Sequence, residues 1–487
     1  MSPNPVHLDL EAMARQVLRQ YGFEPDFPAA AKPQVAQLLA HPPQLVASGV
    51  VRDLRHLLWS SIDNDTSRDL DQIEYAERLP DGSAKVLVGI ADVDAYVPKN
   101  SPIDQHAAQQ TCTLYTGIHN FSMIPDELST GLTSLLEGAD KLCRVTEFVV
   151  GADGRITASD FYAALVRNQA QLAYNAVGAW LEGRGPAPEK VAAAPDLQAQ
   201  LKLQDEVAQI LRQQRYRHGA LNLDTNEVHP VILNDEVVDV QKQSRNHATD
   251  LIEDFMIAAN GMVARRLETV PSLRRIVKTP ARWDRIVQLA SSLGGHLPGE
   301  PDSKALNDFL LQRKAADPVH FADLSLAMVK LIGPGEYVLE RPGDAVSGHF
   351  GLAVQDYTHS TAPNRRFPDL VTQRILKAAL AGQPPAYTDT ELTAIAANCT
   401  VKGNAARKLE RGMAKRLSAV AMSKRIGQVF DAIVTGVNEH GTFVRALAPH
   451  VDGMLVRGEE GLDVGDKVRV RLVRTDVSQG YIDFEKA

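Results

Sequence analysis

The chain has 487 residues, of which 44% are hydrophobic, and its formal net charge at pH 7 is −8. This length allows two or three domains with at least one large core, and the composition is that of a globular protein. The acidic balance argues against a uniformly basic nucleic-acid binder, and no apolar run reaches the length needed to cross a membrane.

The cysteines and the first residues bear on the cellular compartment. Cys112, Cys143 and Cys399 are far apart and form no Cys-x-x-Cys pair. This usage favours a reducing compartment and provides neither a disulfide framework nor a zinc motif. The opening residues, MSPNPVHLDLEAM, lack the basic-then-apolar layout of a secretory signal. We therefore expect a cytoplasmic protein with no membrane partner.

Three units are predicted along the chain. Residues 1–48 are predicted to form a small helical unit, starting with LEAMARQVLRQYGF, for which a helix-turn-helix-like form is one option. Residues 49–425 contain no linker longer than a loop and mix strand-like runs with long helices, which indicates one large α+β domain. Residues 426–487 contain five short alternating runs, VFDAIVTGV, GTFVRAL, GMLVRG, KVRVRLVRT and YIDFEK, and are predicted to form a five-stranded OB-type barrel.

Two helices of the large domain have start signals in the sequence. In DLIEDFMIAANGMVARRL (250–267), Asp250 is expected to cap the helix, with Glu253 three residues further on. In RRFPDLVTQRILKAAL, Pro368 suits the first helical turn.

The segment SIDNDTSRDLDQ (61–72) concentrates negative charge. Asp63, Asp65, Asp69 and Asp71 fall within nine positions, just before the strand-like run IEYAER and a turn at residues 80–82. These aspartates are therefore expected in a loop that enters a sheet. A polar turn with solvated carboxylates is the simplest interpretation of such a segment.

Two metal-binding interpretations compete with the solvated turn. An EF-hand loop would take its ligands from Asp63, Asp65, Ser67, Asp69, Asp71 and Glu74. However, the sixth position holds Arg68 where this loop needs glycine, and the following residues resemble a hairpin instead of a helix. The other interpretation is a catalytic site, in which two Mg²⁺ ions about 4 Å apart hold the attacking water and the leaving oxygen of a phosphodiester.

Five segments in chain order resemble motifs of the RNB family, the 3′-to-5′ exoribonucleases of the ribonuclease II and ribonuclease R type. They are SIDNDTSRDLDQ, LYTGIHNFSMIPDELSTGLTSL, ATDLIEDFMIAANGMVA, YTHSTAPNRRFPDLVTQR and ARKLERGMAKR. The last residues, from about 427, are similar to the S1-type RNA-binding barrel of that family. The resemblance extends over residues 50–487 and implies an RNB-type catalytic domain followed by an S1-like barrel.

The resemblance also implies an activity and a set of site residues. It implies hydrolysis of single-stranded RNA from the 3′ end to nucleoside 5′-monophosphates, by a monomer that uses Mg²⁺ or Mn²⁺ and no small-molecule cofactor. The metal site implied by the motif comprises Asp63, Asp69, Asp71 and Gln72, and the implied catalytic groups are Asp69, Asp71 and Arg365. The implied RNA contacts are Tyr115, which matches a base-stacking tyrosine, with Arg365, Glu410, Arg407 and Arg411.

Other roles are open for some of these residues. Glu410 can instead pair along its helix with Arg407, three residues before it, as helical glutamates usually do. His119 and His359 are candidate general bases, but lone histidines are more often structural, and two-metal hydrolysis does not require one. Residues 402–425 carry eight basic side chains against Glu410 as the single acid, which favours a local site for a polyanion.

The sequence departs from the family pattern in two places. Gln72 stands where the motif has its last aspartate, and a glutamine offers a carbonyl oxygen without charge. Its duty can shift to Asp65. The residues before the first motif are also too few for the two cold-shock barrels that usually precede this domain, so we expect a short variant without them. An inactive RNA-binding protein of the same fold and a calcium-binding module remain alternatives.

Overall fold

The computed structural model describes residues 9–44, 50–224, 228–233, 236–242, 245–318, 320–345 and 348–487. The first helices are α1 (Leu10–Gln20) and α2 (Ala31–Ala40), in agreement with the predicted helical start of the chain. Residues 1–8 and 45–48 of that predicted unit lie outside the described residues. α1 packs its buried Val17 and Leu18 against Leu409 of the long helix α12 (Asp389–Ser423).

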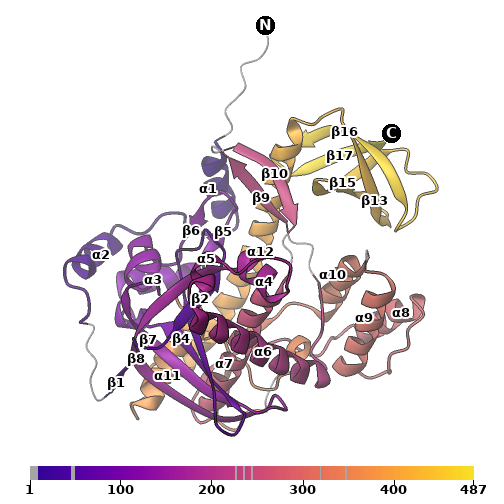
Figure 1. Ribbon diagram of the computed structural model, residues 1–487. Coiled ribbons are helices and arrows are strands. Elements are labelled where there is room, and N and C mark those ends of the chain that lie inside the picture. Colours follow the sequence, from indigo (N-terminus) through magenta and orange to yellow (C-terminus); the bar gives the residue numbers. More distant parts are fainter. Residues whose placement is uncertain are drawn as a thin grey trace.

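A six-stranded sheet organises the large domain (Figure 1). Its strands, in spatial order, are β1 (Val51–Asp53), β8 (Ile156–Ala173), β2 (Trp59–Asp63), β3 (Gln72–Arg78), β4 (Ala84–Ala91) and β7 (Asp140–Val150). The long strand β8 also pairs with β7, so that β8, β2, β3, β4 and β7 form a closed ring of pairings. The β3–β4 hairpin turns at residues 79–83, as the sequence predicts.

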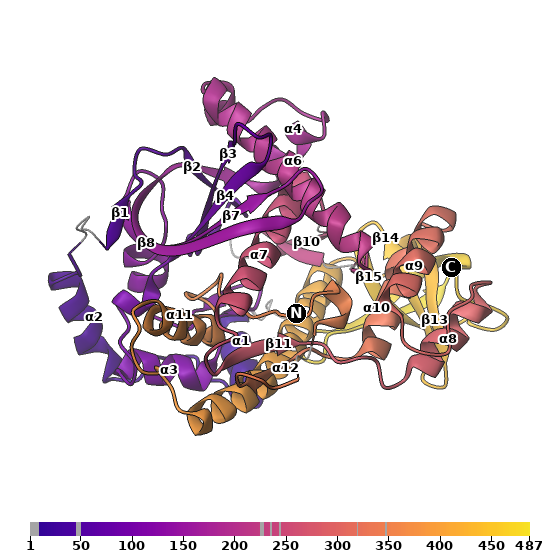
Figure 2. The same ribbon diagram turned by 90° about the horizontal axis from the view of Figure 1, so that it is seen from below.

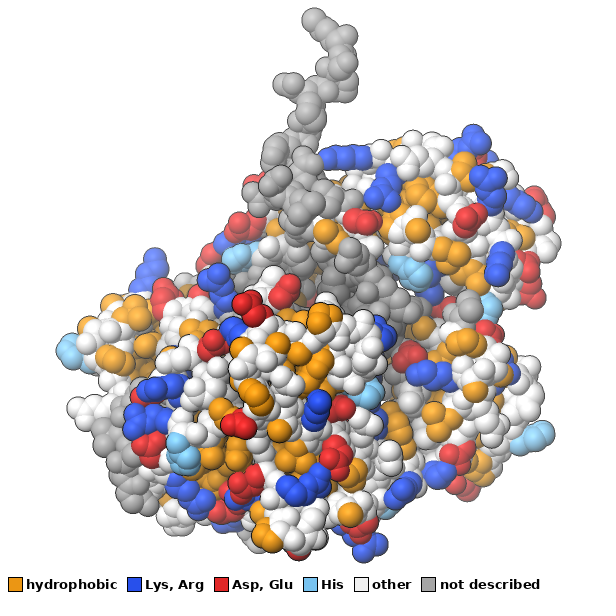
Figure 3. Space-filling model, in the orientation of Figure 1, with side chains coloured by type: hydrophobic (Ala, Val, Ile, Leu, Met, Phe, Trp, Pro, Cys, Tyr) orange, Lys and Arg blue, Asp and Glu red, His pale blue; other side chains and the backbone are white. Residues whose placement is uncertain are grey.

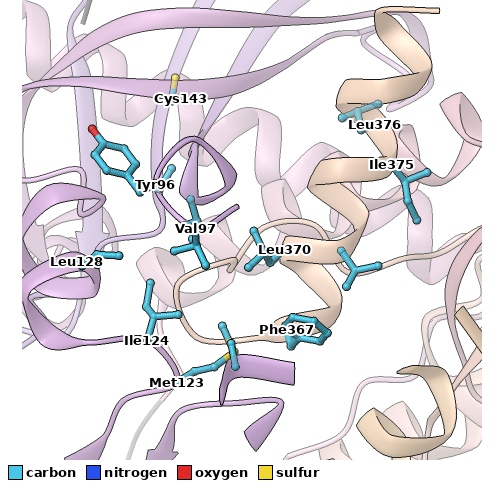
Figure 4. Close-up of a cluster of buried hydrophobic side chains, with 14 of the residues drawn as sticks. Tyr96, Val97, Met123, Ile124, Leu128, Cys143, Phe367, Leu370, Ile375 and Leu376 are labelled. Carbon is cyan, nitrogen blue, oxygen red and sulfur yellow. The ribbon is translucent and has the colours of Figure 1, made fainter. Parts of the chain in front are cut away.

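Helices cover both faces of this sheet (Figure 2). On one face, Ile62, Val88 and Leu172 pack with α4 (Tyr174–Leu181), α6 (Pro195–Arg217) and α7 (His247–Arg266). On the other, Trp59 and Ile73 share a core with α3 (Pro102–Gln110), α11 (Phe367–Leu380) and α12. Figure 4 shows part of this second core, where Phe367 and Leu370 of α11 face Val97 and Ile124.

The start of α7 differs from the prediction. The helix begins at His247, and its N-cap is Asn246, whose side chain accepts hydrogen bonds from the backbone of Ala248 and Thr249. Asp250 is therefore not the cap; it lies in the first turn, where Arg212 and Arg245 pair with it. Both residue types can cap a helix, and the hydrophobic pattern did not show that the helix begins one turn earlier. Pro368 lies in the first turn of α11, as predicted.

Smaller elements surround this body. The short hairpin β5 (Leu114–Tyr115) and β6 (Asn120–Phe121) lies near α1. A helical unit with its own core consists of α8 (Trp283–Ser292), α9 (Ser303–Ala316) and α10 (Phe321–Ile332). Other elements are the helix α5 (Glu189–Ala192) and the strands β9 (Val228–Leu233), β10 (Glu236–Lys242), β11 (Ser272–Ile276) and β12 (Glu336–Glu340).

The C-terminal residues form the predicted five-stranded barrel, seen in yellow in Figure 1. Its strands are β13 (Val429–Asn438), β14 (Gly441–Leu447), β15 (His450–Arg457), β16 (Lys467–Asp476) and β17 (Tyr481–Lys486). Alternate residues such as Val444, Val470 and Phe484 fill the interior, which is why these runs alternate in sequence. Arg445 of the barrel pairs with Asp323 of α10 at 3.1 Å.

The surface is mixed in charge. Acidic and basic side chains alternate over the face shown in Figure 3, so the net charge of −8 is not gathered into one patch on that face. Within the described residues, no helix combines the length and the apolar character that a membrane span requires.

Candidate active site

The aspartate run forms the loop between β2 and β3, as predicted, with Asp63 ending β2 and Gln72 beginning β3. Leu70 holds the loop in place because its side chain is fully buried in the sheet core. Its N–H donates to the hydroxyl of Ser134, and its carbonyl accepts from the N–H of Leu135. The backbone that carries the carboxylates is thus held in place. The loop is followed by the strand β3, whereas an EF-hand loop is followed by a helix.

Asp71 lies at the centre of the site and is only 1% exposed. One carboxylate oxygen accepts the backbone N–H of Asn364 at 2.8 Å, and the other accepts Nε of Arg365 at 3.1 Å. Burial raises the pKa of Asp71 to about 7; Arg365 and the N–H of Asn364 lower this pKa, and the nearby charge of Asp69 raises it. A cation beside Asp71 would therefore stabilise its ionised form.

The turn that carries Arg365 is fixed from α11. Asp369, which is fully buried, accepts the backbone N–H of Ala362 and a guanidinium N–H of Arg366. The carbonyl of Arg365 accepts the N–H of Thr113 at 3.0 Å. The Arg365 side chain remains 41% exposed, so part of its planar fork faces solvent beside Asp71.

Tyr115 joins the aspartate loop to α12. Its hydroxyl donates to Asp69 at 3.2 Å, and its backbone N–H donates to Glu410 at 3.1 Å. The residue is 39% exposed, so part of Tyr115 is open to solvent. In α12, Arg407 donates to Asn404, so the alternative partner considered for Glu410 bonds elsewhere.

Asp63 lies beside the same arginine. Its carboxylate accepts the N–H of Asn64 and the hydroxyl of Ser67, while burial raises its pKa and the charge of Arg365 lowers it. Behind Asp63, in β3, Glu74 is fully buried, and burial and the charge of Asp63 hold its pKa well above the usual range.

The donor set suits a hard cation such as Mg²⁺. Asp63, Asp69 and Asp71 offer carboxylate oxygens, and the 4%-exposed Gln72 adds an amide. Within the described residues, no three His, Cys, Asp or Glu side chains come close enough to hold one metal ion together. Mg²⁺ usually takes one or two protein carboxylates and fills its other positions with water and substrate phosphate, so this set fits it.

The structure brings most predicted site residues together and leaves two apart. Asp63, Asp69, Asp71, Arg365, Tyr115 and Glu410 are linked by the bonds and charges described above. Arg407 and Arg411 are exposed on α12, and Arg407 lies close enough to Arg275 to lower its pKa, although burial lowers that pKa more. His359 is buried with a strongly lowered pKa, due first to burial and then to Arg366, and bonds to Tyr337 at 2.7 Å, as a structural histidine would.

Sequence reasoning missed three contributors. Asn364 binds Asp71 through its backbone, and Asp369 holds the turn of Arg365 from the next helix. Asn364 precedes Arg365 and Asp369 follows it by four positions, but their roles depend on main-chain geometry that the sequence does not show. Glu74 was noticed only as a calcium ligand, because its burial could not be read from a strand with mixed polarity.

Comparisons with known proteins identify the family. The model of the RNB domain matches residues 51–382, and that of the RNase II-type exonuclease C-terminal S1 domain matches residues 428–487. Ribonuclease R of Escherichia coli (strain K12) is 30% identical over 96% of this chain and 61% of its own length. This chain thus spans about three fifths of the length of that curated relative.

Solved structures agree on the fold. Mycoplasma genitalium RNase R in complex with ribose methylated single-stranded RNA aligns with a TM-score of 0.84 at 22% identity, over 98% of this chain and 78% of that one. Yeast Ssd1, described as a pseudonuclease, aligns with a TM-score of 0.73 at 16% identity, over 97% of this chain and 58% of that one. The fold therefore occurs both in a ribonuclease and in a pseudonuclease. The chain belongs to the RNB family and combines its RNB domain with a C-terminal S1 domain.

Proposed function

We propose that this protein is a hydrolytic 3′-to-5′ exoribonuclease that degrades single-stranded RNA to nucleoside 5′-monophosphates with the help of Mg²⁺ or Mn²⁺. The observation that carries the proposal is the buried Asp71, held by the N–H of Asn364 and by Arg365, with Asp69 and Tyr115 beside it. A buried carboxylate with a raised pKa, anchored beside an arginine and next to a second carboxylate, is an arrangement typical of active sites.

The divalent metal would be held by one or two of the carboxylates of Asp63, Asp69 and Asp71 together with Gln72, and water and substrate phosphate would fill its other positions. When bound, such a metal lowers the pKa of water and stabilises negative charge on phosphate oxygens. Arg365 stands at the edge of this group, with its guanidinium anchored by Asp71 and partly open to solvent. A planar guanidinium in this position can donate to the oxygens of the scissile phosphate as their charge increases.

Tyr115 and Glu410 would bind the end of the RNA. The ring of the partly exposed Tyr115 can stack on a base without regard to its identity, as a non-specific nuclease requires. The hydroxyl of Tyr115 and its N–H are already engaged, which fixes the ring between the aspartate loop and α12. Glu410 can accept a hydrogen bond from a ribose 2′-hydroxyl, a group that RNA has and DNA lacks.

Two exposed basic residues lie on the helix that carries Glu410. Arg407 and Arg411 lie on α12, which runs from the catalytic domain to the barrel (Figure 1). Their side chains would bind RNA phosphates without reading sequence. The proposal therefore predicts that their loss weakens RNA binding more at low salt than at high salt.

The proposal is tested with purified protein, a 5′-labelled single-stranded RNA and Mg²⁺. We expect a ladder of shortening products that ends in a short oligonucleotide, with nucleoside 5′-monophosphates released at each step. Asp71→Asn should remove this activity while leaving RNA binding in place. Full-length RNA after long incubation with the parent protein would contradict the proposal.

One observation favours a second candidate, an RNA-binding protein without catalysis. Gln72 replaces a charged ligand of the family motif, and a pseudonuclease shares the fold. The same assay separates the two, because such a protein would retard RNA in a gel without shortening it.

A further inference from the structure

Glu74 is a buried carboxyl group without a partner. It lies in the middle of β3, is 0% exposed, and neither of its oxygens has a hydrogen-bond partner among the described residues. Leaving an ionisable group in the interior without a partner costs several kcal/mol, on the order given by transfer measurements. Such a group therefore points to something that binds it there.

A second unpartnered oxygen faces Glu74 across the sheet. Ser60 of β2 pairs with Glu74 in the antiparallel sheet. The Ser60 hydroxyl is also buried and has no hydrogen-bond partner among the described residues. Opposite side chains of such a pair lie about 5 Å apart at Cβ. The two residues bring three oxygens and no nitrogen donor, a set that suits a hard cation and its bound water.

Glu74 lies on the same side of β3 as Gln72. Successive side chains of a strand point to opposite faces, so residues 72, 74 and 76 share one face and Ile73 points to the other. The packing agrees, because Ala76 belongs to the core under α7 and Ile73 to the opposite core. Gln72 and Glu74 therefore lie two positions apart on one face of β3.

Asp63 and Tyr174 adjoin Glu74 from two other elements. Asp63 ends β2, the strand whose Ser60 pairs with Glu74, so its carboxyl group lies at the end of the neighbouring strand. Tyr174, the first residue of α4, has its pKa raised mainly by burial and then by both Asp63 and Glu74. By contrast Asp65, the alternative replacement for the missing charge, is exposed in the loop.

We propose that Glu74 supplies the negative charge that Gln72 lacks, by binding, directly or through one water, a divalent cation held at Asp63 and Gln72. This inference rests on the proposed function, since it adds a residue to the same metal site. Compared with the family motif, the last carboxylate then lies at position 74 instead of position 72, on the same face of the strand. The number of carboxylates at the site is unchanged.

The test is binding of Mn²⁺ alone, counted by electron paramagnetic resonance on the full chain. Glu74→Gln, which keeps shape and removes charge, should weaken Mn²⁺ binding at least about tenfold. Glu77→Gln is the matched control, because Glu77 lies in the same strand on the other face and pairs with Lys85 at the surface; its affinity should stay within about twofold. Binding to Glu74→Gln as tight as to the parent overturns the proposal.

Moving the carboxylate from position 74 to position 72 distinguishes metal binding by Glu74 from a purely structural role. The double variant Gln72→Asp/Glu74→Gln should recover most of the lost affinity, because it returns a carboxylate to the same face. A purely structural role of Glu74 would give no recovery in a folded double variant, and that result overturns the proposal. If Glu74→Gln does not fold, Glu74→Leu, which fills the buried space without a charge, decides: Mn²⁺ binding weakened at least about tenfold supports the proposal, and unchanged binding overturns it.

RNA degradation by the parent protein is measured separately. Degradation by the parent together with unaltered Mn²⁺ binding by Glu74→Gln would leave the proposed function standing and refute the role of Glu74. Mn²⁺ binding that depends on Glu74, without any RNA degradation, would support the role of Glu74 and refute the proposed function.

Discussion

Replacing Asp71 with asparagine should change how the stability of the metal-free protein depends on pH. The folded protein raises the pKa of this group from 3.8 to about 7. At about 1.4 kcal/mol for each pKa unit, this rise corresponds to at most about 4 kcal/mol of unfolding free energy. Because Asp71 is 1% exposed, solvent screening reduces this value little.

The direction of this change with pH depends on whether the folded or the unfolded chain holds the proton of Asp71 more tightly. Below about pH 4, Asp71 is protonated in both the folded and the unfolded chain, and its contribution to stability is complete. Between pH 4 and 7 the unfolded chain releases the proton while the folded chain keeps it, so stability falls as pH rises. Above pH 7 the contribution is lost.

Urea unfolding in EDTA at pH 5, 6, 7 and 8 measures this effect. The difference in unfolding free energy between parent and Asp71→Asn should shift in favour of the variant by about 2.6 kcal/mol from pH 5 to pH 8, because part of the full effect is already lost at pH 5. Asp65→Asn, in the exposed part of the same loop, is the matched control. Saturating Mg²⁺ should remove most of the shift, because a cation stabilises the ionised carboxylate. A difference that stays constant with pH, or shifts in favour of the parent, would refute the reasoning.

Three further predictions concern other residues. Arg365→Lys should lower the single-turnover rate of RNA cleavage about 100-fold or more, because an ammonium cannot reproduce the fork that Asp71 anchors; a change below tenfold would contradict this role. Tyr115→Ala should weaken RNA binding about tenfold in fluorescence anisotropy without metal, whereas Tyr115→Phe, which keeps the ring, should stay near the parent; equal losses would exclude stacking. Asn246→Ala should lower the unfolding free energy by about 1 kcal/mol through the lost cap of α7, and no change would show that the cap is dispensable.

The sequence predicted those features that depend on local pattern. The five barrel strands were predicted because their side chains alternate between a filled interior and solvent, and the hairpin after the aspartates because Pro80, Asp81 and Gly82 mark a turn. The clustering of Asp71, Arg365 and Tyr115 was implied only by family resemblance, since these residues are far apart in the chain.

Other features could be recognised only in the three-dimensional structure. The predicted N-cap of α7, Asp250, was wrong by four positions. Asparagine and aspartate are equally good cap residues, and only the backbone conformation shows that Asn246 is the cap. The anchoring of Asp71 by the N–H of Asn364 involves the main chain, which any residue provides. The burial of Glu74 depends on the helices packed on that face of the sheet, of which α6 contacts β3 directly, a tertiary arrangement that no spacing in the strand reveals.

The most direct test of the central claim follows the very first product. A single-stranded RNA labelled at its 3′-terminal nucleotide is mixed with the protein and Mg²⁺, and the earliest time points are resolved. The account predicts that the label appears at once as a nucleoside 5′-monophosphate, with no labelled fragment of intermediate length, and that Asp71→Asn releases none. Labelled fragments of intermediate length, or RNA that stays bound and intact, would contradict it.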